Sequence, residues 1–164
     1  MITYVVGDLL ASDEIDIAHG CNTAGVMGAG IARAIASDYP EVLRTYETQV
    51  RGRMFVLGSV LPVIVRRFDG KMRTVWNLGT QQSPGPHGSL WGILLSFGNM
   101  LEQMVEWNID RVGIPRIGSG IAGLKWADVE RHIASAQNFV KAEHGRVPEV
   151  VVYTHPSEAN KRWD

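Results

Sequence analysis

The chain has 164 residues, the size of one domain, and its 45% hydrophobic residues can form a core without disulfide or metal support. Its 16 lysines and arginines against 17 aspartates and glutamates give a net charge of −1, which excludes a broad basic field for nucleic acid. The single cysteine excludes an internal disulfide and a cysteine-rich zinc site.

No apolar run reaches the roughly 20 residues of a membrane span, and Met1–Tyr4 lacks the basic and apolar regions of a signal peptide. We therefore expect a soluble, cytoplasmic and monomeric protein without membrane contact. One domain over residues 1–155 is expected to precede a polar, loosely held tail over 156–164.

The first half of the chain predicts two strands, a glycine-rich loop and two helices. The strands are rich in β-branched residues and end at turn residues, and the second helix opens on a proline suited to a first turn. In chain order these elements are Ile2–Val6, Ile15–Cys21, Gly25–Gly30, Ile31–Ser37 and Pro40–Arg51.

The second half predicts a hairpin, a proline- and glycine-rich loop, and then helices alternating with strands. Asp69-Gly70 is a strong hairpin signal between two apolar runs, and apolar residues at helical spacing mark the helices. The elements are Val56–Val65, Arg73–Leu78, the loop Gly79–Gly88, Leu90–Val105, Val112–Ile117, a second glycine loop Gly118–Gly123, Val129–Val140 and Glu149–Thr154.

Strands alternating with helices predict an α/β fold of three layers, with a mixed central sheet and helices on both faces. Each glycine loop follows a strand and precedes a helix, where open α/β sheets bind ligands. Glycine lets the backbone approach a ligand, and a helix N-terminus offers N–H groups to an anion. Two such loops indicate a clamp for a diphosphate, although tight turns alone would also explain the glycines.

Two nucleotide-binding fingerprints fail on context. Gly118–Gly123 matches G-x-G-x-x-G, but the next strand ends in Tyr153-Thr154 instead of an acidic residue. Only one helix and one strand follow that loop, which is too little for a dinucleotide-binding dehydrogenase. No glycine is followed by Lys-Ser or Lys-Thr, which excludes a nucleoside-triphosphate P-loop.

The same loops resemble the ligand loops of the macrodomain family. Asn22 with Gly28–Ala32 matches the first loop, and Pro115–Gly123 matches the second. Ile2–Leu9 and Val151–Tyr153 resemble the family's first and last strands, so the resemblance covers nearly all of residues 1–155 in order and spacing. It implies a macrodomain fold that binds ADP-ribose, with no cofactor and no metal.

The resemblance implies roles for particular residues. Asp8 would accept a hydrogen bond from the adenine amine, Asn22 would hold the distal ribose, and Tyr153 would contact adenine. A capping aspartate, a turn asparagine and a core tyrosine are the alternatives for these three. The other implied ligand-binding residues are Gly7, Leu9, Gly28, Ala29, Gly30, Ile31, Pro115, Gly118, Ser119, Gly120, Ile121, Ala122 and Gly123.

The sequence departs from two catalytic branches of the family. Protein-directed hydrolases carry an aspartate just after the first loop, where this chain has Ala32 or Arg33. The ester-cleaving branch uses a lysine after the central strand and an aspartate in the second loop. Those places hold Thr80 or Gln81, and Ala122.

His19-Gly20-Cys21-Asn22 and Ser119–Trp126 resemble a third branch, which removes phosphate from ADP-ribose 1″-phosphate. That resemblance implies His19 and Asn22 as catalytic residues, because an imidazole can act as acid or base near neutral pH. A hydrogen-bonded structural histidine is the alternative. Cys21, beside an apolar strand, fits a buried small side chain better than a nucleophile.

We therefore expect a macrodomain that hydrolyses ADP-ribose 1″-phosphate. A non-catalytic ADP-ribose reader is one alternative. A hydrolase that removes ADP-ribose from protein or nucleic acid by substrate-assisted water attack is another, and it predicts a nearly neutral His19→Ala. The basic residues around the hairpin, Arg66, Arg67, Lys71 and Arg73, fit a solvated sheet edge, with contact to a macromolecule as the alternative.

Overall fold

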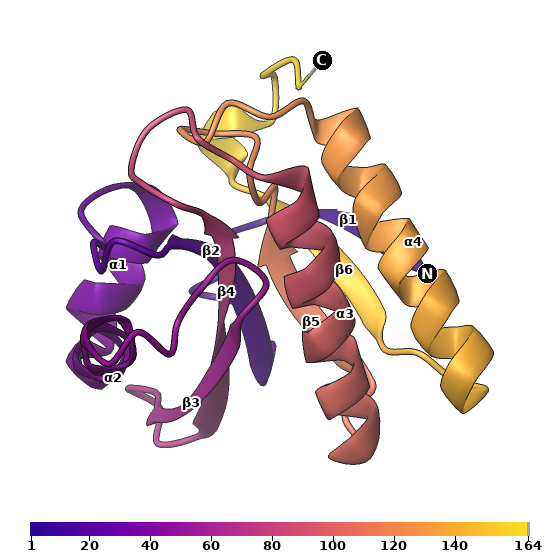
Figure 1. The fold of residues 1–164 in the computed structure, drawn as a ribbon, viewed down its shortest axis with the longest axis horizontal. Helices are drawn as coiled ribbons and strands as arrows, with labels where there is room; N and C mark the ends of the chain where they lie inside the picture. Colours follow the sequence, from indigo (N-terminus) through magenta and orange to yellow (C-terminus); the bar gives the residue numbers. More distant parts are fainter. Residues whose placement is uncertain (164) are drawn as a thin grey trace.

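A computed structural model describes residues 1–163 as a central sheet between two pairs of helices. The strands are β1 (Ile2–Val6), β2 (Asp16–Asn22), β3 (Val60–Arg66), β4 (Met72–Gln81), β5 (Arg111–Pro115) and β6 (Glu149–Thr154). The helices are α1 (Gly30–Asp38), α2 (Pro40–Arg51), α3 (Leu90–Glu106) and α4 (Trp126–His144), and a short 3₁₀ helix, η1, spans Pro156–Glu158. Helices α1 and α2 cover one face of the sheet, and α3 and α4 cover the other (Figure 1).

The six strands run in the order β1-β6-β5-β2-β4-β3. Every neighbouring pair is parallel except β3 and β4, which form the antiparallel hairpin expected around Asp69-Gly70. The predicted three-layer α/β fold with a mixed sheet is confirmed. Because five strands share one direction, their carboxyl ends meet along one edge, where ligands of open α/β sheets bind.

Alternation along the strands divides the buried side chains between two cores. Ala18 and Trp76 pack under α3 and α4, whereas Ile17 and Val75, one residue before each, pack under α1 and α2. The sheet is therefore covered on both faces, as parallel sheets require.

The strand predicted over Val56–Val65 begins later, at Val60. Residues 56–59 form a turn in which the Ser59 hydroxyl accepts from the Val56 N–H at 2.8 Å. Gly58 there has φ +86°, a left-handed conformation that glycine adopts without strain. Local turn chemistry therefore overrides the β-branched run.

The basic hairpin is not a solvated edge throughout. Arg73 is 1% exposed, and its guanidinium donates to the carbonyl oxygens of Leu10, Ser12 and Glu14 at 2.7–3.0 Å. Arg67 pairs with Asp69 at 3.1 Å, and its Nη1 donates to the Ser12 carbonyl at 2.9 Å. Both arginines hold neighbouring segments of this chain.

The segment after β6 does not hang free, in contrast to the loosely held tail expected from its polarity. It forms η1 and then returns to α4, where the Trp126 N–H donates to the Trp163 carbonyl at 3.4 Å. The Trp163 side chain packs against the core under α3 and α4. No helix within residues 1–163 has the length and apolarity needed to cross a bilayer.

Candidate ligand-binding cavity

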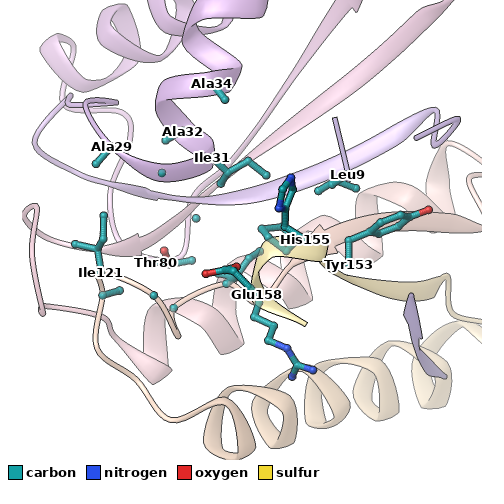
Figure 2. A pocket seen from close by; sticks show the side chains of 18 of the residues that line it. Leu9, Ala29, Ile31, Ala32, Ala34, Thr80, Ile121, Tyr153, His155 and Glu158 are labelled. Carbon is teal, nitrogen blue, oxygen red and sulfur yellow. The ribbon is translucent and has the colours of Figure 1, made fainter. Parts of the chain in front are cut away.

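A cavity of about 840 Å³ opens at the carboxyl ends of the parallel strands (Figure 2). Both glycine loops line it, as does the end of β1. The cavity brings together most of the residues implied as ligand-binding: Gly7, Asp8, Leu9, Asn22, Gly28, Ala29, Gly30, Ile31, Pro115, Gly118, Gly120, Ile121, Ala122 and Tyr153. His19, Ser119 and Gly123 do not line it.

The first glycine loop leads into α1 without a side-chain cap. The N-cap residue, Ala29, makes no side-chain hydrogen bond to the helix, so the N–H groups of the first turn have no protein partner there. Ile31, Ala32 and Ala34 of this helix line the cavity. Small side chains and free N–H groups at a helix N-terminus make a site for an anion.

Asn22 shapes this loop from β2. Its Nδ2 donates to the Val26 carbonyl at 2.8 Å, and its Oδ1 accepts from the backbone N–H groups of Ala24 and Val26 at 3.1 and 3.2 Å. The Tyr46 hydroxyl donates to the Asn22 backbone carbonyl at 2.5 Å and lies 2.9 Å from the same Oδ1. The amide is therefore engaged in fixing the loop, and a contact with the distal ribose stays a prediction.

The second glycine loop offers three successive free donors. Gly118 has φ +79°, which turns the chain so that the Leu124 N–H reaches the Gly118 carbonyl at 2.8 Å. Among the hydrogen bonds of residues 1–163, the backbone N–H groups of Gly120, Ile121 and Ala122 find no acceptor. Successive unpaired N–H groups form a concave anion site of the kind that cradles phosphates.

One end of the cavity carries the residues implied for adenine. Asp8 Oδ1 accepts from the Leu10 N–H at 2.9 Å, closing a turn, and its second oxygen can accept from an amine. The Tyr153 hydroxyl donates to Glu14 at 2.8 Å, which fixes the ring that lines the cavity (Figure 2). Hydrogen bonding to the Glu14 carboxylate and burial raise the pKa of Tyr153, with burial the larger cause.

His19 lies behind the cavity wall and not on it. The side chain is completely buried, and its Nε2 is 2.7 Å from Asn77 Oδ1. Because Asn77 Nδ2 donates to the Leu61 carbonyl at 2.9 Å, Oδ1 is the acceptor and Nε2 carries the proton. Burial lowers the pKa of His19 to about 4, so the imidazole is neutral at pH 7. His19 is thus a buried histidine that is hydrogen-bonded to Asn77 and does not line the cavity, and its catalytic role stays a prediction.

Sequence analysis did not select several residues of the opposite end. Thr80, Gln81, Pro84 and Gly85 line the cavity where β4 ends. The signal was available, because β4 is parallel to β2 and its carboxyl end must lie beside the first glycine loop. Cys21 also lines this region, and burial raises the pKa of its thiol, which stays neutral and unreactive at pH 7.

The charged side chains that line the cavity come from elements other than β2 and β4. Asp8 follows β1, Arg116 follows β5, and Glu158 and Lys161 belong to the segment after β6. The wall formed by Asn22, Thr80 and Gln81 presents amide and hydroxyl groups only. Among residues 1–163, no group of three or more His, Cys, Asp or Glu side chains is placed to hold a metal ion.

Together, a three-layer α/β fold and two glycine loops with free N–H groups define a domain with a site suited to an anion at the edge of its sheet. The model of the Macro domain family matches residues 18–133. The chain therefore belongs to the Macro domain family, as its loops indicate.

Among its relatives, a DNA ADP-ribosyl glycohydrolase of Mycobacterium tuberculosis is 30% identical over 162 residues. The match covers 99% of this chain and 44% of the relative, so the chain spans about half the length of that protein. An ADP-ribose 1″-phosphate phosphatase of Lodderomyces elongisporus is 28% identical over 141 residues, covering 79% of this chain and 88% of the relative.

The solved macrodomain of Mycobacterium tuberculosis DarG has a TM-score of 0.79 and 31% sequence identity to this chain. The match covers 93% of this chain and 97% of that one.

Proposed function

We propose that the protein binds ADP-ribose in this cavity and removes it from a nucleic acid by hydrolysis. The observation that carries the proposal is the pair of donor sets in one cavity, the uncapped N-terminus of α1 and the three free N–H groups of Gly120–Ala122. A diphosphate is the ligand group that matches two such sets.

The polarity of the cavity orients the ligand. Adenine lies toward Asp8 and Tyr153, where a carboxylate meets a fixed aromatic ring. The diphosphate lies between the glycine loops, and the distal ribose reaches the wall of Asn22, Thr80 and Gln81. The anomeric carbon, to which an attached macromolecule is joined, then lies at this wall, whose own three side chains are uncharged.

That uncharged wall limits the chemistry. A water molecule attacks the anomeric carbon, and a diphosphate oxygen of the ligand accepts its proton. The bond from that carbon to the leaving group breaks, and the leaving group departs with the bonding electrons and takes up a proton from solvent. The free N–H groups of the second loop hold the diphosphate so that this oxygen can face the attacking water.

A nucleic acid is favoured as the attached group because the Mycobacterium tuberculosis relative, named a DNA ADP-ribosyl glycohydrolase, matches 99% of this chain. ADP-ribose 1″-phosphate is a second candidate substrate, supported by the name of the Lodderomyces elongisporus relative. Its hydrolysis would use the same donors without an imidazole, since His19 does not line the cavity.

Calorimetric titration with ADP-ribose tests binding first. The protein is then incubated with a single-stranded oligonucleotide carrying ADP-ribose, and separately with ADP-ribose 1″-phosphate. Release of ADP-ribose from the oligonucleotide supports the proposal, and phosphate release alone would assign the phosphatase function. Binding without either product would leave a reader of ADP-ribose, and no binding would overturn the proposal.

A further inference from the structure

Arg116 joins four parts of the fold through its guanidinium group. The group lies 5.2 Å from the ring centre of Tyr4, 5.1 Å from that of Trp126 and 5.3 Å from that of Trp163. Its Nε donates to Thr154 Oγ1 at 3.3 Å. A cation within about 6 Å of an aromatic face is attracted to it, so Arg116 ties the segment after β6 to β1 and α4.

The segment 155–163 has further attachments along its length. His155 Nδ1 accepts from the Ser157 N–H at 3.2 Å and starts η1. The Lys161 ammonium lies 4.2 Å from the ring centre of Trp163, and the Trp163 carbonyl accepts from the N–H of Trp126. The segment therefore follows a defined path across the end of the sheet.

This path brings the segment to the cavity. Its residues that line the cavity are His155, Ser157, Glu158, Lys161 and Trp163. In Figure 2, His155 lies toward Tyr153, Ala29 and Ile121 of the glycine loops lie on the opposite side, and Glu158 lies between the two groups. The segment is thus part of the wall on the side of the adenine-binding residues.

We propose that segment 155–163 forms the wall that binds the adenosine half of ADP-ribose, with Glu158 accepting hydrogen bonds from the hydroxyl groups of the adenosine ribose. Arg116 is a positioning residue that holds this wall in place. The inference rests on the proposed function, because it uses the orientation of ADP-ribose given above.

The negative charge of Glu158 makes the wall selective between hydroxyl and phosphate groups on the adenosine ribose. A carboxylate accepts from hydroxyl groups and repels phosphate. Lys161 Nζ lies 3.5 Å from Glu158 Oε1 and orients the carboxylate, leaving its other oxygen for the ligand. ADP-ribose with free adenosine hydroxyls is therefore the expected ligand, and a 2′-phosphate on that ribose is expected to be excluded.

The experiment measures dissociation constants of ADP-ribose and of ADP-ribose 2′-phosphate for the wild type and Glu158→Ala. We expect the variant to bind ADP-ribose about tenfold more weakly, the scale of one hydrogen bond to a charged group. It should also lose most of the preference against the 2′-phosphate. Equal binding of ADP-ribose by both proteins, or a wild-type preference for the 2′-phosphate, would overturn the inference.

The positioning role of Arg116 is tested by comparing single variants with a double variant. Arg116→Gln should weaken ADP-ribose binding to the same extent as Glu158→Ala, and the double variant should lose little more, because both act through one wall. Trp163→Phe, which keeps a ring over Arg116, should bind better than Trp163→Ala. Additive losses, or equal binding by both Trp163 variants, would contradict this role.

Trp91→Ala is the matched control, since Trp91 is an exposed tryptophan of α3 that does not line the cavity. It should bind ADP-ribose as the wild type does. If the wild type itself fails to bind ADP-ribose, the proposed function fails. If it binds and the variants of the wall bind equally well, only the present inference fails.

Discussion

At the scale of the residue, Asp8 and His19 show how the position of a polar side chain decides its chemistry. Asp8 follows the last residue of β1 and lines the cavity, whereas His19 lies within β2 and is completely buried. Both are titratable side chains selected for their chemistry. Only Asp8 is placed to contact a ligand.

Asp8→Asn tests the adenine contact. The variant keeps an oxygen for the Leu10 N–H, but an NH₂ group replaces the second acceptor and opposes an adenine amine. We expect calorimetry to show ADP-ribose binding weakened by about 1.5–3 kcal/mol. Asp13→Asn, at an exposed position that does not line the cavity, is the control. An unchanged dissociation constant in Asp8→Asn would remove this residue from the adenine site.

His19 makes the stability of the fold depend on pH. Its pKa falls from an ordinary 6.5 to about 4 on burial. Between these two pH values the imidazole is protonated in the unfolded chain and neutral in the folded protein. The free energy of unfolding should therefore decrease as the pH falls from 6.5 to 4, by about 3 kcal/mol in total.

Urea unfolding at pH 7 and pH 4.5 measures this decrease, and His19→Gln should show a shallower dependence on pH. Hydrolytic activity should survive the same substitution, provided that the variant folds. An unchanged pH slope, or loss of activity in a folded variant, would contradict the structural role of His19.

At the scale of the element, a substitution in the second glycine loop is expected to change ligand binding without changing folding. A Cβ added at Gly120 meets nothing within 4 Å, and Gly120 lines the cavity beside the free N–H groups. Gly120→Val should therefore fold normally and lose most of its ADP-ribose binding, because the branched side chain occupies the space of the diphosphate. Thermal unfolding and calorimetry together measure the two effects.

Gly98→Val is the matched control for that substitution. Gly98 lies in α3, outside the cavity lining, and a Cβ there also meets nothing within 4 Å. It should leave binding unchanged. Normal binding by Gly120→Val would show that the phosphates lie elsewhere.

The sequence predicts the elements well where local pattern decides them. The glycine loops, the Asp69-Gly70 hairpin and the helical spacing of α3 and α4 are all present in the structure. The late start of β3 is missed because a serine and a glycine form a turn inside an apolar run. The apolar periodicity predicts α4 only over Val129–Val140, whereas the helix spans Trp126–His144.

The parts of the site that sequence reasoning misses depend on contacts between distant residues. Period-two alternation places His19 on one face of β2, but it cannot tell a buried face from the cavity edge. The role of the segment after β6 depends on Arg116, 47 residues before Trp163 in the chain. No local pattern in that polar segment reveals the pairing.

At the scale of the whole molecule, the cavity is built from five strand ends, the start of α1 and the 3₁₀ helix η1, so a ligand there links distant parts of the chain. Binding to the folded state alone raises stability by mass action. At a free ADP-ribose concentration 100 times the dissociation constant, the gain is about 2.7 kcal/mol. For a chain of this size the melting temperature should rise by roughly 5–10 °C.

Differential scanning fluorimetry with increasing ADP-ribose measures that rise. Gly120→Val should melt at the same temperature with and without the ligand. A rise of equal size in this variant would show that the ligand stabilises the protein from another site.

The guanidinium of Arg73, which binds three carbonyl oxygens of the loop after Asp8, has a kinetic consequence. A loop tied down before the ligand arrives loses little conformational entropy on association. Collision with the ligand then needs no prior rearrangement of this loop, which favours fast association. We therefore expect Arg73, remote in sequence from Asp8, to increase the rate at which a nucleotide binds at this end of the cavity.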